Sequence, residues 1–203
     1  GRMRGARAGA ELASAGLSGV FSSPLSRACQ TAGYISPGFS FLEDFREAYE
    51  GDWEGLPFDE IRSRWPELYS RRGSDPGLLP PGSEPYGSRS SRFSSGLSLA
   101  LESTSGDIAA VSHSGVTQAF LGGVMNISAR EFMALPLPYG SVTEIWENGG
   151  VFSVVSVGSV PHPTLTDGLC ETLMSCAGPP PEVISPCRSS AATPAGLCAA
   201  LHC

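Results

Sequence analysis

Two short segments of the chain carry side chains of the types that bind and transfer anionic groups. The first, Ser22-Ser23-Pro24-Leu25-Ser26-Arg27, follows a short apolar run. Serine followed by proline is typical of a helix N-terminus, whose free N–H groups and partial positive charge attract anions. Arg27 would lie one turn into that helix, where its planar guanidinium can bind two phosphate oxygens. An ordinary capped helix with a surface arginine would contain the same residues.

The second segment is Ser112-His113-Ser114-Gly115, which follows the apolar run at 107–112. In open α/β sheets, ligands bind where a strand ends and the next helix begins. His113 would stand at such a junction, and Gly115 would let a ligand approach the backbone closely. A histidine in this place can equally be a structural residue whose hydrogen bonds are satisfied.

A third segment, residues 45–55, holds the acids Glu47, Glu50, Asp52 and Glu54 among glycines and aromatic residues. Acids at this density usually form a solvated surface. A partly shielded carboxyl group close to a bound anion can, however, have a raised pKa and serve as a general acid.

These segments must be positioned by an alternation of helices and strands. Helices are predicted over 1–16, 25–35, 58–65, 67–71, 86–103 and 114–125, and strands over 17–22, 41–42, 107–112, 142–146 and 151–157. The stretch 147–150 is typical of a hairpin turn, and 73–85 of a long loop. The alternation predicts an α/β fold over residues 1–162, a three-layer αβα sandwich with a mostly parallel sheet. Strand 107–112 should be central, with the strand that ends at Ser22 beside it.

Residues 163–203 differ in character from the rest of the chain. They contain five of the six cysteines and a run of three prolines. No two cysteines are spaced as C-x-x-C, which argues against a zinc site or a redox pair and favours reduced thiols, as in the cytoplasm. We therefore expect a linker or an incomplete C-terminal segment that packs little against the body, with no metal site, and we expect a cytoplasmic protein.

Composition and charge exclude several classes of partner. The 203 residues carry a net charge of -7, and all 13 basic residues are arginines. An acidic chain of this kind lacks the basic face of a nucleic-acid-binding protein. No apolar run reaches the roughly 18 residues of a membrane helix, so no membrane partner is expected. The oligomeric state stays open.

Taken together and in order, four segments resemble those of the histidine phosphatase superfamily, the phosphoglycerate mutase-like fold. FSSPLSRACQTA is similar to its Ser-Ser-Pro-Leu-x-Arg-Ala-x-Gln-Thr-Ala stretch, and FREAYEGDWEGL to its Leu-Arg-Glu…Gly-x-Trp-Glu-Gly segment. PPGSEP stands where Pro-Pro-Gly-Gly-Glu-Ser is usual, and VSHSGV where Val-Ser-His-Gly-Gly-Val is usual. The resemblance covers residues 1–162.

The resemblance implies a role for each matching residue. Arg27 would bind phosphate, with Ser23 as its neighbour in the pocket. His113 would stabilise the phosphoryl group in transfer, and Glu47 would donate a proton to the leaving group. The implied reaction moves a phosphoryl group from a small phosphorylated metabolite to a histidine, and then to water or to another position of the substrate, without a metal or other cofactor.

One feature of the family is absent from the sequence. Its opening strand ends in Arg-His-Gly, whose histidine is the nucleophile, and this chain contains no Arg-His dipeptide. The chain thus resembles a domain that lacks this N-terminal strand. His162 and His202 are predicted not to substitute, because neither is expected to follow a strand of the sheet. The chain is therefore expected to be inactive, because it lacks the nucleophile.

Several functions stay open on these grounds. The first is a phosphomonoesterase, with alpha-ribazole phosphate, a sugar phosphate or another metabolite as substrate. The alternative is a non-catalytic phosphate-ligand module or pseudo-enzyme domain of a larger fusion protein. A phosphoglycerate mutase is less favoured, because the chain between Trp53 and His113 is short for the loops that hold a phosphoglycerate.

Overall fold

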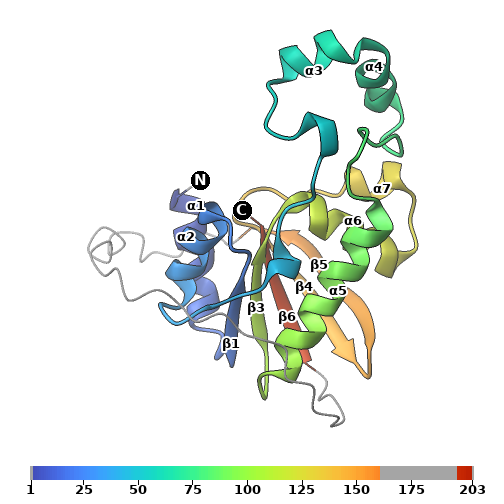
Figure 1. The fold of residues 1–203 in the computed structure, drawn as a ribbon. Coiled ribbons are helices and arrows are strands. Elements are labelled where there is room, and N and C mark those ends of the chain that lie inside the picture. Colours follow the sequence, from blue (N-terminus) through green and yellow to red (C-terminus); the bar gives the residue numbers. More distant parts are fainter. Residues whose placement is uncertain (1, 161–195, 203) are drawn as a thin grey trace.

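The computed structural model describes residues 2–160 and 196–202. A central sheet is covered by helices on both sides, and a small helical cap stands above one end of it (Figure 1). The elements in chain order are α1 (Arg2–Ala13), β1 (Gly19–Ser22), α2 (Ser26–Ile35), β2 (Ser40–Phe41), η1 (Glu43–Phe45), η2 (Gly51–Trp53), α3 (Phe58–Arg64), α4 (Pro66–Ser74), α5 (Tyr86–Glu102), β3 (Ile108–Ser112), α6 (Ser114–Met125), α7 (Ala129–Met133), β4 (Val142–Asn148), β5 (Val151–Ser159) and β6 (Gly196–His202).

The six strands are arranged in the order β2-β1-β3-β6-β4-β5. The first four are parallel to one another, while β4 is antiparallel to both of its neighbours. Val20 of β1 pairs with Ala109 of β3, which confirms the prediction that these two strands are adjacent in the sheet. The three-layer αβα architecture with a mostly parallel sheet is confirmed as well.

The strand β6 corrects the expectation for the C-terminal segment. Residues 163–203 were expected to pack little against the body, yet Gly196–His202 lies in the sheet between β3 and β4. Its side chains at Cys198, Ala200 and Leu201 are fully buried. Most of this segment, residues 161–195, lies outside the described residues, as does the predicted domain boundary at 162.

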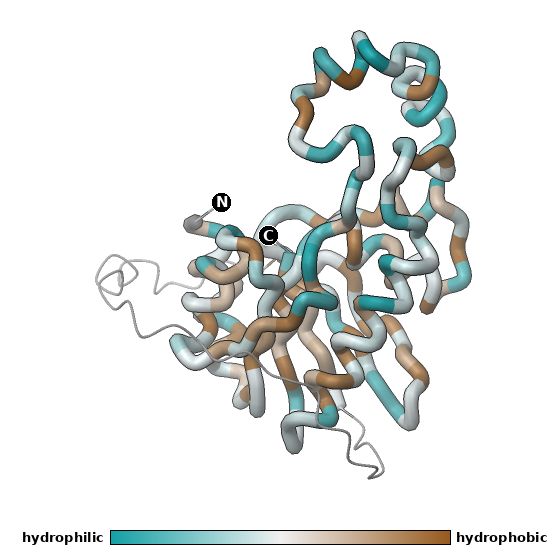
Figure 2. The backbone as a smooth tube through the Cα atoms, in the orientation of Figure 1, coloured by the Kyte–Doolittle hydropathy of each residue, from teal (hydrophilic) through white to brown (hydrophobic). Residues whose placement is uncertain are grey.

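Two hydrophobic clusters hold the layers together, one on each face of the sheet. On the face that we call the first face, α1 and α2 pack on alternate residues of β1, β3 and β6. On the second face, α5 and α6 pack against the intervening residues, with Phe93, Leu97 and Phe120 at the centre. In Figure 2 the strands carry many of the hydrophobic positions, as burial on both faces requires.

The cap consists of α3, α4 and the loops that flank them. Pro66, which lies between the helices predicted over 58–65 and 67–71, is the first residue of α4, a position where its missing N–H costs nothing. The helix α4 has no buried residue. Within residues 2–160 and 196–202, no helix combines the length and the apolar character that crossing a membrane requires.

Candidate active site

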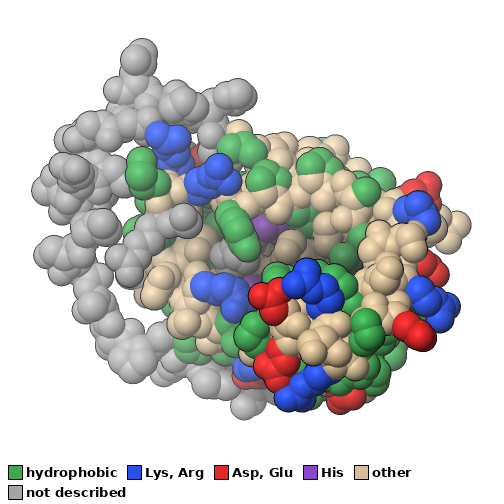
Figure 3. Space-filling view, turned by 90° about the horizontal axis from the view of Figure 1, so that it is seen from above, with side chains coloured by type: hydrophobic (Ala, Val, Ile, Leu, Met, Phe, Trp, Pro, Cys, Tyr) green, Lys and Arg blue, Asp and Glu red, His purple; other side chains and the backbone are tan. Residues whose placement is uncertain are grey.

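The predicted site residues gather at the carboxyl edge of the parallel strands. Ser23 directly follows β1, and His113 directly follows β3. Seen from above in Figure 3, a histidine side chain lies at the bottom of a hollow bordered by arginine and hydrophobic side chains. This is the edge at which open α/β sheets bind ligands.

Ser23, Arg27 and His113 are joined by direct hydrogen bonds. Nε of Arg27 donates to Nδ1 of His113 at 3.1 Å, although the two residues are 86 positions apart in the sequence. Nε2 of His113 lies 2.8 Å from Oγ of Ser23. Because a guanidinium can only donate, Nδ1 must be the acceptor, and a neutral His113 therefore carries its proton on Nε2 and donates it to Ser23.

The local sequence explains why Ser23 and Arg27 face this edge. Oγ of Ser23 also accepts a hydrogen bond from the backbone N–H of Leu25 at 3.3 Å, just before α2 begins at Ser26. Ser23 thus holds the backbone of Leu25, the N-cap residue of α2, and Arg27 follows in the first turn. The predicted place of Arg27 one turn into the helix is confirmed. The predicted helix cap by Ser23 is not formed, because the helix begins at Ser26 and its N-cap has no side-chain hydrogen bond.

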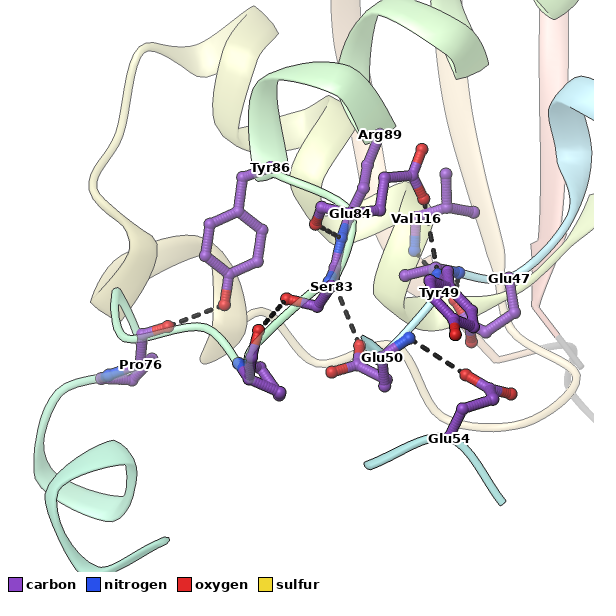
Figure 4. A network of polar contacts seen from close by, with 12 residues as sticks. Glu47, Tyr49, Glu50, Glu54, Pro76, Ser83, Glu84, Tyr86, Arg89 and Val116 are labelled. Carbon is purple, nitrogen blue, oxygen red and sulfur yellow. Dashed lines mark hydrogen bonds and ion pairs between the residues drawn. The ribbon is translucent and has the colours of Figure 1, made fainter. Parts of the chain in front are cut away.

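The carboxylate of Glu47 is held against the start of α6. Its Oε1 accepts hydrogen bonds from the backbone N–H of Val116 at 3.1 Å and of Ala48 at 2.9 Å (Figure 4). A Cβ atom on Gly115 would come 2.8 Å from this oxygen, so glycine is needed for the close approach. Glu47 is therefore held at the positive end of α6 by a residue that lies three positions after His113 in the chain.

A network of polar contacts holds the segment that carries Glu47 to the base of the cap (Figure 4). The backbone N–H of Glu84 donates to the carbonyl of Tyr49 at 2.9 Å. Arg89, only 1% exposed, donates from Nε to the carbonyl of Glu84 at 2.8 Å and pairs with Glu50 at 3.2 Å. Burial raises the pKa of Glu84, but the hydrogen bond and charge of Arg92 outweigh it, so the pKa is lowered overall. These contacts position the segment that carries Glu47 relative to the cap.

His202 occupies a place that the sequence prediction excluded. It is the last residue of β6, and its Cα pairs with that of Ser112, the residue before His113. Its Nε2 lies 2.9 Å from Oγ1 of Thr143, while its buried Nδ1 has no hydrogen-bond partner. Burial, with a smaller contribution from His113, lowers the pKa of His202 to about 3. The imidazole is therefore neutral at physiological pH.

The prediction about His202 failed although a signal was present in the sequence. The apolar run Leu197–Leu201 is followed by a histidine, just as the run that ends at Val111 is followed shortly by His113. A short apolar run has the same appearance in a buried strand and in other apolar segments. His162 lies outside the described residues. Across the described residues, no group of three or more histidine, cysteine or acidic side chains is arranged to hold a metal ion.

Comparison with known proteins identifies the family of this chain. The family described as histidine phosphatase superfamily (branch 1) matches residues 1–159. The bifunctional protein Rv2228c of Mycobacterium tuberculosis (strain ATCC 25618 / H37Rv) is 38% identical over 89 residues, a stretch that covers 42% of this chain and 24% of that protein. An uncharacterized protein of Mycobacterium bovis, Mb2253c, matches with the same identity and coverage. The match thus spans about a quarter of the length of these curated relatives.

Solved structures share the fold. YhfR of Bacillus stearothermophilus superposes with a TM-score of 0.70 at 27% identity, covering 79% of this chain and 83% of that one. The mycobacterial glucosyl-3-phosphoglycerate phosphatase Rv2419c gives 0.66 at 20% identity, covering 78% and 84%. A putative alpha-ribazole-5'-P phosphatase from Escherichia coli str. K-12 substr. MG1655 gives 0.64 at 20% identity, covering 81% and 84%. At 20% identity the last two establish likeness of fold alone.

Proposed function

Because this chain belongs to the histidine phosphatase superfamily, we propose that it hydrolyses the phosphate monoester of a small metabolite. The proposal rests on one observation. Ser23, Arg27 and His113 contact one another at one edge of the sheet, and the carboxylate of Glu47 contacts the start of the adjacent helix α6. Phosphoryl transfer depends mainly on positioning and on charge aimed at the phosphoryl oxygens, and these side chains supply both.

Each residue has a distinct part in the proposed reaction. Arg27 and the first N–H groups of α2 bind the phosphoryl oxygens, and the hydroxyl of Ser23 donates a hydrogen bond to them. The Nε2–H of His113, which donates to Ser23 in the free protein, turns to the same oxygens when the ester binds. A histidine nitrogen attacks phosphorus while the bond to the leaving oxygen breaks, and Glu47 gives that oxygen a proton. Water then attacks the phosphorus of the phosphohistidine, and its proton passes to the Glu47 carboxylate. The P–N bond breaks, inorganic phosphate leaves, and the free enzyme is restored.

His202 is the candidate acceptor of the phosphoryl group. An inactive chain was expected because no second histidine was predicted at the end of a central strand, and β6 ends with one. Its low pKa keeps the ring neutral, which leaves a nitrogen lone pair for attack. We therefore propose turnover by the chain rather than inactivity.

The second candidate function is a phosphate-binding module without turnover, as part of a larger protein. The observation that favours it is the confinement of His202, which is 1% exposed and has Nε2 within hydrogen-bond distance of Thr143. In such a module Arg27 and His113 would bind a phosphorylated ligand, and no phosphohistidine would form.

One set of assays separates these functions. We expect wild-type protein to release p-nitrophenol from p-nitrophenyl phosphate between about pH 5 and 7 and to form an acid-labile phosphoenzyme. Arg27→Ala should weaken inhibition by inorganic phosphate and lower kcat, since it removes charge from both the bound ester and the transition state. Arg62→Ala, at an exposed pair with Asp59, should change neither.

The role of Glu47 is tested by the leaving group. We expect Glu47→Gln to lower kcat by roughly 10²-fold or more on an alkyl phosphate, and by less on p-nitrophenyl phosphate. The reason is that an alkoxide needs the proton and a nitrophenolate does not. Equal losses on both substrates would contradict a proton-donor role. Phosphate binding with no turnover and no phosphoenzyme would establish the module instead, and turnover abolished by His113→Ala but unaffected by His202→Asn would make His113 the acceptor.

A further inference from the structure

Two charged side chains near the start of α5 contact the main chain on both sides of Glu47. Arg92 lies in the second turn of α5, and Glu84 lies just before the helix begins at Tyr86. The guanidinium and the carboxylate are paired in two places, Nε to Oε1 and Nη2 to Oε2, each at 2.9 Å. A bidentate pair of this kind fixes both planar groups in one mutual orientation.

Arg92 also holds the main chain that leads to Glu47. Its Nη1 donates to the carbonyl of Asp44 at 2.7 Å and to the carbonyl of Arg46 at 3.0 Å. The carbonyl of Arg46 belongs to the peptide group that joins Arg46 to Glu47. Four of the five N–H groups of the guanidinium are therefore engaged, two by the carboxylate and two by carbonyls just before Glu47.

Glu84 holds the main chain that follows Glu47. Its Oε2 accepts a hydrogen bond from the backbone N–H of Tyr49 at 3.5 Å, and its own backbone N–H donates to the carbonyl of Tyr49 at 2.9 Å (Figure 4). The residue that carries the carboxyl group of the site is thus held from both sides. The two side chains that hold it also bind each other.

The pair of Arg92 and Glu84 is shielded from water. The side chain of Arg92 is 21% exposed and that of Glu84 is 19% exposed. The side chains of the pair Arg62 and Asp59 on α3 are, in contrast, 65% and 88% exposed. An exposed pair contributes little, whereas a shielded charge that loses its partner is costly. The shielded pair therefore keeps one geometry.

The packing of α5 fixes this pair relative to the core. Phe93 is fully buried, and its ring lies 5.2 Å from the ring of Phe45. A Cβ atom on Gly96 would come 2.8 Å from Cβ of Asp44, so α5 and the segment before Glu47 are in close contact. The same helix packs along α6, whose start binds the carboxylate of Glu47. The main chain and the carboxylate of Glu47 are therefore held by two helices that pack on each other.

We propose that Arg92 and Glu84 are positioning residues for Glu47, and that they set the place from which its carboxyl group gives a proton to the leaving oxygen. This inference rests on the proposed function, in which Glu47 is the proton donor. The pair acts through the main chain at Arg46 and Tyr49 rather than through contact with the substrate. Proton transfer needs the donor within hydrogen-bond distance of the leaving oxygen, and a displacement of about 1 Å can lower the rate by roughly 10²-fold.

The substitution Arg92→Lys in the full-length chain tests the proposal. Lysine keeps the charge but cannot bind the carboxylate in two places and both carbonyls at once. We expect kcat on an alkyl phosphate to fall by roughly 10- to 10²-fold, kcat on p-nitrophenyl phosphate to fall much less, and inhibition by inorganic phosphate to stay unchanged. Arg62→Lys, at the exposed pair with Asp59, is the matched control and should change none of these.

The ratio of the two kcat values separates positioning from a structural role. A smaller folded fraction lowers kcat on both substrates by the same factor and leaves their ratio unchanged. A second comparison uses Glu47→Gln as the background. Because the pair acts through Glu47, adding Arg92→Lys to Glu47→Gln should lower kcat on the alkyl phosphate no further.

Two results would overturn the proposal even where Glu47→Gln behaves as the loss of a proton donor. One is an equal change, or no change, of kcat on the two substrates in Arg92→Lys. The other is a loss in the double variant as large as the sum of the two separate losses in activation free energy. If the wild type shows no turnover, or Glu47→Gln loses equally on both substrates, the proposed function fails and the positioning role fails with it. If Arg92→Lys does not fold, as judged by its circular dichroism, Glu84→Gln replaces it, with the same expected change in the ratio.

Discussion

Two histidines stand side by side at the end of neighbouring strands and differ in what surrounds them. His113 is engaged on both ring nitrogens, by Arg27 and by Ser23. His202 has Thr143 on Nε2 and no hydrogen-bond partner on its buried Nδ1. Burying an imidazole disfavours its charged form, which is why the pKa of His202 falls to about 3.

The pH dependence of stability should reveal this buried imidazole. The pKa of His202 is 6.5 without perturbation and about 3 in the folded protein. Between those values the unfolded chain binds the extra proton, so the free energy of unfolding rises with pH, by up to about 1.4 kcal/mol per unit from this group. The contribution is fully present above pH 6.5 and is lost as the pH falls toward 3.

We expect His202→Gln to remove that slope. Urea unfolding measured in steps from about pH 4 to 8 should give a difference between wild type and variant that shrinks toward acid and is constant above neutrality. Other groups titrate in this range in both proteins and cancel in the difference. A difference that stays constant with pH would mean that His202 is not buried as a neutral ring.

At the scale of elements, the start of α6 connects Glu47, the proposed proton donor, to the proposed phosphate site. Glu47 comes from the irregular segment after η1, and its carboxylate reaches the N–H of Val116 in the first turn of the helix. Ser112, at the end of β3, donates from Oγ to the carbonyl of Phe45 at 2.8 Å. Two hydrogen bonds thus tie the segment of Phe45 and Glu47 to the strand and the helix on either side of His113.

Gly115→Ala tests this arrangement, with Gly33→Ala as its control. Both glycines lie in helices, where alanine is favoured by about 0.5–1 kcal/mol. The added Cβ at Gly115 would meet Oε1 of Glu47 at 2.8 Å, whereas at Gly33 nothing lies within 4 Å. We expect Gly33→Ala to raise the melting temperature with unchanged kcat.

For Gly115→Ala we expect a lower kcat on an alkyl phosphate and no gain in melting temperature, because the carboxylate must move. Thermal unfolding and steady-state kinetics on the two variants give the comparison. Unchanged kcat in Gly115→Ala would show that the position of Glu47 does not matter for turnover.

At the scale of the whole molecule, the sheet is completed by the end of the chain. The strand β6 pairs with β3 on one side and with β4 on the other, so it joins the parallel part of the sheet to the β4–β5 hairpin. Both hydrophobic clusters include residues of β6. The stability of the body should therefore depend on residues near the C-terminus.

We expect Leu201→Ala to destabilise the protein by about 2–5 kcal/mol, the range for a fully buried leucine. Met125→Ala, at a side chain that is 41% exposed on α6, should change the free energy of unfolding by about 0.5 kcal/mol or less. Urea unfolding at neutral pH measures both. A neutral effect of Leu201→Ala would mean that β6 does not belong to the sheet.

The sequence alone determined the features that depend on short stretches of chain. The helix start near Ser23 and the buried strand before His113 were readable because capping and burial patterns are local. The hairpin was also readable, because Gly149 and Gly150 both adopt the positive φ that its turn requires. The order of the motifs carried the resemblance, and with it the candidates Arg27, Glu47 and His113.

Only the tertiary structure decided which distant segments meet. The sequence could not show that Nε of Arg27 would contact His113, that Glu47 would reach Val116, or that Gly196–His202 would be a central strand. The physical reason is that strand pairing joins residues far apart in the chain, and its gain appears only when the whole sheet is assembled. An apolar run such as Leu197–Leu201 has no fixed partner until β3 and β4 leave a place between them.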